Sequence, residues 1–278
     1  MKKLLIIDGS ALLFQSFYGM PRKIVNNKGQ NVEAVICFVG ILFKTIAMHS
    51  ADELLIVFDG ENDLARKEID DQYKSNRQDY SCVEDQDNPF LQLETIKLVL
   101  DHLGFKWQET IGCEGDDFIA SIVNDNKKQC NIVISSPDKD FYQLICDTVS
   151  VFTYRGKVST LIDKRAVYDK YGFDPVYFDT FKALVGDNSD NIKGIRGIGP
   201  KTASTLIKDF GGLENILKNA HKLKSSLRDL IVGNKQKLLQ NLQIISLKDK
   251  TGLCERSDWG YAFPKESSTN ILKKMGIL

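Results

Sequence analysis

The sequence predicts an α/β protein whose mostly parallel sheet is flanked by helices. Three short apolar runs, rich in branched side chains, lead into acidic residues; the runs are 4–7, 54–58 and 132–134. Buried strands of parallel sheets have this composition. Helical apolar patterns separate them, at 32–48, 89–103 and 114–125. This alternation is typical of right-handed β-α-β units.

Acidic residues stand where each predicted strand ends. Asp8 follows the first run, Asp59 follows the second, and Asp138 and Asp140 follow the third. The carboxyl ends of parallel strands lie along one edge of a sheet, where ligands bind. We therefore expect these four carboxylates to converge.

The third helical pattern begins with Glu114, Asp116 and Asp117. Acids at a helix start commonly cap it and offset its dipole, and capping alone accounts for this group when it is taken in isolation. Later in the chain, Asp187 and Asp190 stand three residues apart, a spacing that can place both on one face of a helical turn.

Taken together, these acids form a candidate cation site. So many like charges in one cleft would raise one another's pKa values unless multivalent cations neutralised them. Ligation by oxygen alone favours Mg²⁺ or Mn²⁺ over zinc. The candidates number nine: Asp8, Asp59, Glu114, Asp116, Asp117, Asp138, Asp140, Asp187 and Asp190.

A glycine-rich segment follows the last pair of acids. Gly194, Gly197 and Gly199 permit a tight turn, and Pro200 suits the first position of a helix. Free backbone N–H groups at such a helix start bind phosphate, and Lys201 adds a positive charge. A helix cap with a connecting loop is the simpler alternative. Beside a metal site, the anion-binding interpretation indicates a nuclease.

The distribution of charge supports a nucleic-acid partner. The chain balances 37 basic against 37 acidic residues, yet residues 192–250 hold twelve Lys and Arg against four Asp and Glu. A basic region beside an acidic pocket predicts salt-sensitive binding that does not depend on base sequence.

Six motifs in order carry a resemblance to a known family. The chain resembles the bacterial 5′-nuclease (flap endonuclease) family, which includes the exonuclease domain of DNA polymerase I and the free-standing exonuclease IX type, and we expect a stand-alone member. The motifs are Ile7–Ser10, Val57–Gly60, Tyr73–Arg77, Glu114–Asp117, Ser136–Asp140, and Gly186–Ile192 followed by Gly197–Lys201.

The resemblance implies a fold and an activity. A PIN-like or resolvase-like catalytic domain would span residues 1–172, with a helical arch around 62–95. A helical DNA-binding domain would span 173–278 and contain a helix-three-turn-helix (helix-hairpin-helix) at 183–212. The implied activity is hydrolysis of DNA phosphodiesters at 5′ flaps, nicks or gaps, in replication or repair, with two Mg²⁺ ions or Mn²⁺ in their place.

The resemblance also assigns roles to residues. Asp8, Asp59, Glu114 and Asp116 would serve the first metal, and the remaining five acids the second. Lys74 would be the electrostatic catalyst, with Arg77 in the same motif. Main-chain carbonyls that would hold K⁺ belong to Leu184, Val185, Lys193, Ile195 and Ile198. Residues that would contact the DNA backbone are Arg196, Gly197, Ile198, Gly199, Pro200, Lys201 and Thr202.

Three departures from the family pattern bear on substrate choice. Gln15 stands where arginine is usual, and Glu33 replaces a small or amide residue. The arch region is acidic, since residues 52–94 hold thirteen Asp and Glu but four Lys and Arg. An acidic run of this kind is usually solvated surface.

Two other functions compete with nuclease activity. A phosphatase with an aspartyl nucleophile needs a second Asp where Ser10 stands, and a DNA-structure-binding protein of the same fold would have weak or lost catalysis. Six cysteines without a C-x-x-C pair indicate a reducing compartment, and the start is too short for a signal peptide or a membrane span. We expect a cytoplasmic monomer.

Overall fold

A computed structural model describes residues 1–60, 65–254 and 257–278. Its centre is a sheet of six strands in the order β3-β2-β1-β4-β5-β6. The first five run parallel and β6 is antiparallel to β5. This confirms the mostly parallel sheet. The strands are β1 (Lys2–Asp8), β2 (Glu53–Phe58), β3 (Trp107–Glu109), β4 (Cys130–Ser135), β5 (Val149–Thr153) and β6 (Thr160–Ile162).

The register of the central strands makes their carboxyl ends level. Asp8 of β1 lies opposite Val57 of β2, and Ile7 lies opposite Ser135 of β4. The residues that follow β2 and β4 therefore emerge beside Asp8, at one edge of the sheet.

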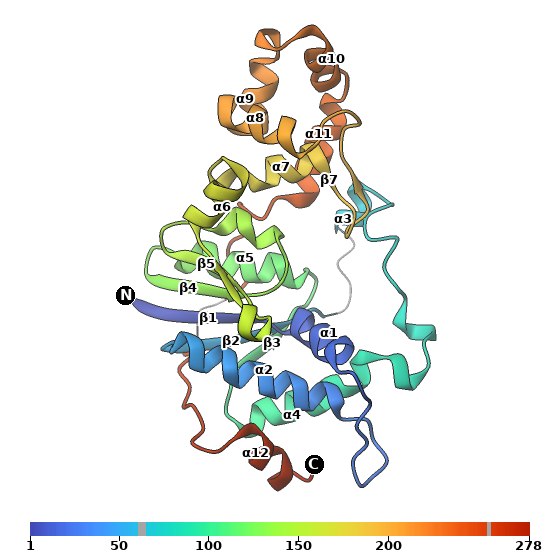
Figure 1. Cartoon of the computed structure of the whole chain (residues 1–278), viewed down its shortest axis with the longest axis vertical. Coiled ribbons are helices and arrows are strands. Elements are labelled where there is room, and N and C mark those ends of the chain that lie inside the picture. Colours follow the sequence, from blue (N-terminus) through green and yellow to red (C-terminus); the bar gives the residue numbers. More distant parts are fainter. Residues whose placement is uncertain (61–64, 255–256) are drawn as a thin grey trace.

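Helices cover both faces of the sheet (Figure 1). One face packs on α1 (Gly9–Gly19), α2 (Glu33–His49), α4 (Leu93–His102) and α12 (Ser268–Lys274). The opposite face packs on α5 (Gly115–Asn126) and the short helix η4 (Asp140–Leu144). Successive residues of β1 alternate between these two cores: Leu5 and Ile7 lie in the first, and Leu4 and Ile6 in the second. Burial on both faces accounts for the continuous apolar run.

A helical region continues the second core away from the sheet (Figure 1). Its helix α7 packs on α8 and α11. The elements are α6 (Lys164–Tyr171), η6 (Pro175–Tyr177), α7 (Phe178–Val185), β7 (Gly186–Asp187), β8 (Ile192–Lys193), α8 (Pro200–Phe210), α9 (Leu213–Lys218), η7 (Ala220–Lys222), α10 (Ser225–Gly233) and α11 (Lys235–Ile245).

The end of the chain packs with the sheet rather than with these helices. Gly260 bridges to Glu53 of β2, the Tyr261 hydroxyl donates to the Ala51 carbonyl at 2.9 Å, and Ile271 and Leu272 of α12 lie in the core beneath α2. The last residues of the predicted 173–278 domain thus contribute to the core on one face of the sheet.

Two glycines allow the chain to turn sharply between α7 and α8. Gly186 has φ +88°, and a Cβ there would lie 2.3 Å from the Gly194 nitrogen. A Cβ on Gly194 would lie 2.2 Å from the Val185 carbonyl oxygen. The two backbones approach this closely because neither residue has a side chain.

The segment predicted as a helical arch contains only short helical pieces in its described part. They are α3 (Ala65–Ile69), η1 (Tyr80–Cys82), η2 (Asp85–Asp87) and η3 (Pro89–Gln92), with turns over residues 71–76, and α4 begins at Leu93. Residues 61–64 lie outside the described ranges. Tyr80 and Phe90 pack edge-on against Phe14 of α1, which attaches the segment to the sheet domain. Within the described ranges, the structure contains no helix with both the length and the apolar character needed to cross a bilayer.

Candidate metal centre

Four carboxylates gather at the carboxyl edge of the sheet, and we call Asp8, Asp59, Asp116 and Asp138 the strand-end cluster. Asp8 accepts hydrogen bonds from the Ser136 hydroxyl at 2.7 Å and from the Ala11 amide at 2.9 Å. Asp59 accepts from the Gly115 amide, at the start of α5, at 2.6 Å. Backbone and hydroxyl donors thus fix these carboxylates at the level strand ends.

The strand-end cluster carries more negative charge than its surroundings neutralise. Burial, together with Asp59 and Asp138, raises the pKa of Asp8 to about 7. Burial and the neighbouring carboxylates raise the pKa of Asp116 well above its ordinary value. Burial also raises the pKa of Asp138, with Asp190 and Asp187 adding to the shift against the opposing effect of Lys182. Such a site favours a bound cation.

A second group, the hairpin cluster, comprises Asp140, Asp187 and Asp190. These residues offer one carboxylate oxygen each, and the three oxygens lie within 4.8 Å of one another. The prediction of a helical turn for Asp187 and Asp190 is wrong, because Asp187 ends β7 and Asp190 lies in the turn before β8. Asp187 accepts from the Ser189 amide at 2.8 Å, a local bond that competes with helix formation.

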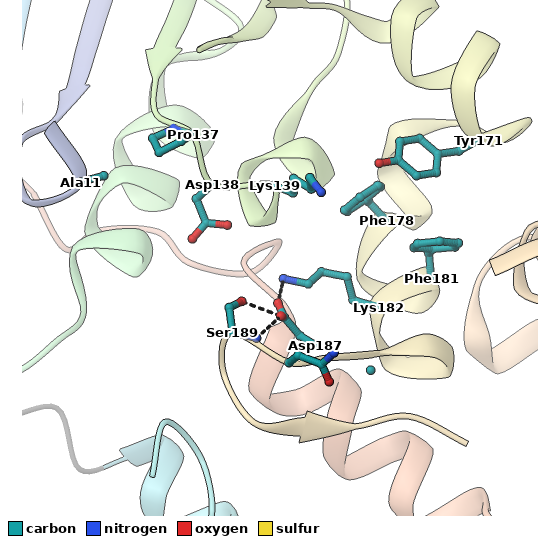
Figure 2. Close-up of a pocket in the computed structure, with 12 residues that line it drawn as sticks. Ala11, Pro137, Asp138, Lys139, Tyr171, Phe178, Phe181, Lys182, Asp187 and Ser189 are labelled. Carbon is teal, nitrogen blue, oxygen red and sulfur yellow. Dashed lines mark hydrogen bonds and ion pairs between the residues drawn. The ribbon is translucent and has the colours of Figure 1, made fainter. Parts of the chain in front are cut away.

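Lys182, in the last turn of α7, was not anticipated from the sequence. Its ammonium group donates to both Asp140 and Asp187, and Figure 2 shows it pointing at Asp187 beside Ser189. Burial would raise the pKa of Asp187, but Lys182 and Ser189 hold it below its usual value. Arg77 adds a guanidinium group 2.8 Å from Asp190. The hairpin cluster is therefore compensated by basic side chains.

Glu114 and Asp117 face basic residues as well. Glu114 accepts from Lys74 and Arg66, each at 2.6 Å. Burial would raise the pKa of Glu114, but these two cations outweigh it and lower that pKa. Asp117 lies 2.6 Å from Arg66 and 3.1 Å from the ammonium group of Lys250. The structure therefore brings Asp117 into an ion-pair network on the α5 side of the site.

Lys74 lies in a turn rather than in a helix. Its φ is +55°, in the left-handed region that non-glycine residues seldom adopt. Its ammonium group lies over the Tyr73 ring, 4.9 Å from the centroid, and bonds Glu114. Arg66, which like Lys182 and Lys250 was not anticipated from the sequence, is buried beside it and donates to the Ile244 carbonyl of α11 at 2.8 Å.

A cavity of about 570 Å³ lies between Asp138 of the strand-end cluster and Asp187 of the hairpin cluster (Figure 2). Asp138 and Lys139 form one side, and Lys182 and Asp187 form another. Three rings close the far end, from Tyr171, Phe178 and Phe181. The volume is within the range of small-molecule sites, so part of a substrate fits beside the carboxylates.

The predicted anion-binding turn has the expected form. Gly197 has φ +94°, and α8 begins at Pro200 with Lys201 exposed beside it. Of the carbonyls predicted to hold K⁺, that of Leu184 accepts from the Ile195 amide at 2.9 Å, and that of Lys193 accepts from Asn241 at 3.1 Å. Each carbonyl oxygen keeps a second lone pair.

Gln15 of α1 and Glu33 of α2, which depart from the family pattern, each form a hydrogen bond within the fold. The Gln15 amide donates to the Tyr154 carbonyl at 2.9 Å, which ties α1 to the end of β5. Glu33 is buried, and its carboxylate accepts from the Ile24 amide at 3.4 Å.

Comparisons with known proteins agree with this geometry. The family described as "5'-3' exonuclease, N-terminal resolvase-like domain" matches residues 3–172, and "5'-3' exonuclease, C-terminal SAM fold" matches 173–261. The 5'-3' exonuclease of Aquifex aeolicus is 34% identical over 248 residues, which cover 89% of this chain and 82% of the relative. The thermostable DNA polymerase I of Thermus thermophilus is 34% identical over 244 residues, which cover 87% of this chain. Those residues span 28% of the polymerase's length.

Solved structures show the same fold. A structure of the T5 D15 protein co-crystallised with metal ions has a TM-score of 0.75 at 24% identity, covering 89% of this chain and 90% of that one. The catalytic core of Rad2 in complex with DNA substrate has a TM-score of 0.62 at 15% identity, covering 99% and 92%. With both family descriptions matched in sequence, this chain belongs to the 5′-3′ exonuclease family.

Proposed function

We propose that this protein is a metal-dependent 5′ nuclease that hydrolyses DNA phosphodiesters at 5′ flaps, nicks or gaps. One observation carries the proposal: a single cavity is lined by Asp138 of the strand-end cluster and by Asp187 of the hairpin cluster. Lys74, ion-paired with Glu114, also contributes to the charge around Asp116 and Asp138. The Aquifex relative is named a 5'-3' exonuclease, and the Rad2 core is in complex with DNA substrate, so both names support a nuclease that acts on DNA.

The donors of both clusters suit Mg²⁺ or Mn²⁺. All are carboxylate oxygens, which hard cations prefer. The strand-end cluster would hold one ion, because a cation would offset the burial of Asp8 and its repulsion by Asp59, which together raise its pKa. The hairpin cluster would hold the other once Lys182 has moved aside. When bound, the two ions supply an activated water and offset charge on the leaving oxygen.

The chain's own residues account for the remaining steps. Lys74, released from Glu114, would place its ammonium group against the scissile phosphate, where negative charge increases in the transition state. Arg77 would neutralise the phosphate from the same turn. The rings of Tyr171, Phe178 and Phe181 line one end of the cavity and would make that end apolar.

The exposed turn at 194–202 would grip duplex backbone without reading bases. Its glycines, the start of α8 and Lys201 form an anion site, and K⁺ held by the nearby carbonyls would stiffen the turn. The division into a catalytic part, 1–172, and a DNA-binding part, 173–278, stays a prediction, as do the monomeric state and the cytoplasmic location.

Cleavage of a 5′-labelled flap duplex with and without Mg²⁺ tests the proposal. We expect Mg²⁺-dependent release of short 5′ products, single-turnover rates lowered by Lys74→Ala with little loss of binding, and duplex affinity lowered by Lys201→Ala for all sequences alike. Dissociation constants are measured in Ca²⁺ to prevent cleavage. Tight binding without cleavage in both Mg²⁺ and Mn²⁺ would establish the non-catalytic alternative, and cleavage of a small phosphomonoester alone would indicate a phosphatase.

A further inference from the structure

The turn that carries Lys74, residues 70–77, is bound to the hairpin, residues 186–193, by hydrogen bonds from both sides. The Lys74 amide donates to the Asp190 carbonyl at 3.0 Å. The Asn76 amide group donates to the Asn188 carbonyl at 2.9 Å. These contacts join segments more than 110 residues apart in the chain.

Asn191 contributes the side-chain contacts at the centre of this junction. Its amide nitrogen donates to the Gln72 carbonyl and to the Ser75 hydroxyl, both at 2.9 Å. Its φ is +57°, in the left-handed region that asparagine tolerates better than most residues. Position 191 therefore combines an unusual backbone conformation with two donated bonds that reach the Lys74 turn.

The Lys74 turn needs support from outside itself. Lys74 also has a positive φ, which raises the energy of the backbone and persists only where surrounding contacts hold it. The Lys74 and Tyr73 side chains bond Glu114 on one side, and the Lys74 backbone is held by the hairpin on the other. The hairpin continues directly into the turn at 194–202. The Ile195 amide, in that continuation, donates to the Leu184 carbonyl at 2.9 Å and anchors the segment to α7.

We propose that Asn191 is a positioning residue that holds the Lys74 turn in its working place, so that duplex bound at 194–202 fixes Lys74 over the scissile phosphate. The inference rests on the proposed function and adds to it a coupling between duplex binding at 194–202 and the position of Lys74. Without Asn191, the grip on duplex would persist while the lysine lost its placement. A misplacement of about 1 Å at a reacting group can cost about 100-fold in rate.

Two substitutions separate the amide from the backbone conformation. Asn191→Gly keeps access to positive φ and removes both bonds, and Asn191→Asp keeps the shape but cannot donate. We expect each to lower the single-turnover rate at saturating flap DNA by about tenfold or more, with the dissociation constant in Ca²⁺ unchanged within about twofold. The matched control is Asn219→Ala, which removes a 2.9 Å bond to the Asn215 carbonyl in the same helical region.

Hydrogen exchange provides a readout that does not depend on catalysis. In the wild type with Ca²⁺, duplex DNA should slow exchange of the amides in residues 70–78, and Asn191→Gly should abolish that slowing. Ser75→Ala removes one acceptor by a mild change, and its rate effect should be less than additive with Asn191→Gly.

Three results would overturn the inference: normal exchange and rate in Asn191→Gly, a loss confined to affinity, or full additivity with Ser75→Ala. If the wild-type protein bound duplex but did not cleave it, the proposed function would fail, and the exchange measurement would still decide the coupling.

Discussion

The strand-end and hairpin clusters are both acidic, yet they differ in how far neighbouring basic side chains neutralise their charge. Asp8 of the strand-end cluster is buried, and burial together with the charges of Asp59 and Asp138 raises its pKa to about 7. In the hairpin cluster, Lys182 binds two carboxylates and Arg77 binds the third. The pKa of Asp187 is lowered there, against the effect of burial.

The two clusters differ in charge compensation because different backbone elements hold their carboxylates. Level strand ends in a parallel sheet place Asp8, Asp59 and Asp138 together regardless of repulsion, because the core fixes the backbone. The hairpin lies at the end of α7, where a lysine in the last helical turn reaches it. A rigid edge therefore retains its repulsion until a cation binds, whereas the hairpin cluster already has an internal counterion.

The largest expected effect is loss of catalysis when the strand-end cluster loses a ligand. Asp8→Asn should lower the single-turnover rate in Mg²⁺ by more than about 100-fold, since even groups that only support metal ligands are worth about 10- to 100-fold. Flap binding in Ca²⁺ should change far less. A rate within about threefold of the wild type would remove Asp8 from the metal site.

Neighbouring acids from the two clusters should shift thermal stability in opposite directions in EDTA. Asp138→Asn removes repulsion and should raise the melting temperature by a few degrees, on a scale of about 2–4 °C per kcal/mol. Asp140→Asn leaves Lys182 with a single carboxylate partner and should lower the melting temperature. Equal shifts of the melting temperature with the same sign in both variants would mean that Lys182 does not stabilise Asp140 more than Asp138.

Removing the internal counterion should tighten cation binding. Lys182→Met keeps most of the length of the side chain, removes its charge and frees Asp140 and Asp187, so Mn²⁺ affinity measured by calorimetry without DNA should rise by about tenfold. Lys139→Met is the matched control, because Lys139 lines the same cavity and is exposed. Equal gains in Mn²⁺ affinity in both variants would indicate a general effect of the lost positive charge rather than removal of Lys182 from the cation site.

The smallest effect is a pH dependence of the metal-free protein. A carboxyl whose pKa is higher in the folded than in the unfolded state stabilises the fold at low pH and loses that contribution as pH rises. For Asp8 the window runs from its ordinary value of 3.8 to about 7. The melting temperature in EDTA should therefore fall between pH 5 and 7.5, less so in Asp8→Asn, and saturating Mg²⁺ should reduce the fall. A wild-type profile identical to that of Asp8→Asn would contradict this.

Strand polarity and apolar composition sufficed to predict that Asp8, Asp59 and Asp138 lie at one edge of the sheet. Asp140, expected with them, instead lies with Asp187 and Asp190, and Asp116 joins the strand-end cluster from α5. Lys182 could not be predicted, since a lysine in the last turn of a helix ordinarily just offsets the dipole. Arg66 lies in a segment rich in acidic residues, which gave no sign of a buried cation. Its contacts are with Asp117 of α5 and Ile244 of α11, and both lie far from it in the sequence. The hairpin form of 186–193 was missed because i, i+3 spacing suits a turn as well as a helix.

The contact between Gly186 and Gly194 determines more than a local bend. A methyl group at either position would collide with main-chain atoms at 2.2–2.3 Å, which no change of rotamer relieves. The two arms of the hairpin would have to separate, and Asp187 and Asp190 would be displaced with them from Asp140. The position of these carboxylates therefore depends on the absence of a Cβ at Gly186 and Gly194. An alanine at either position would displace the hairpin cluster although every carboxylate is still present.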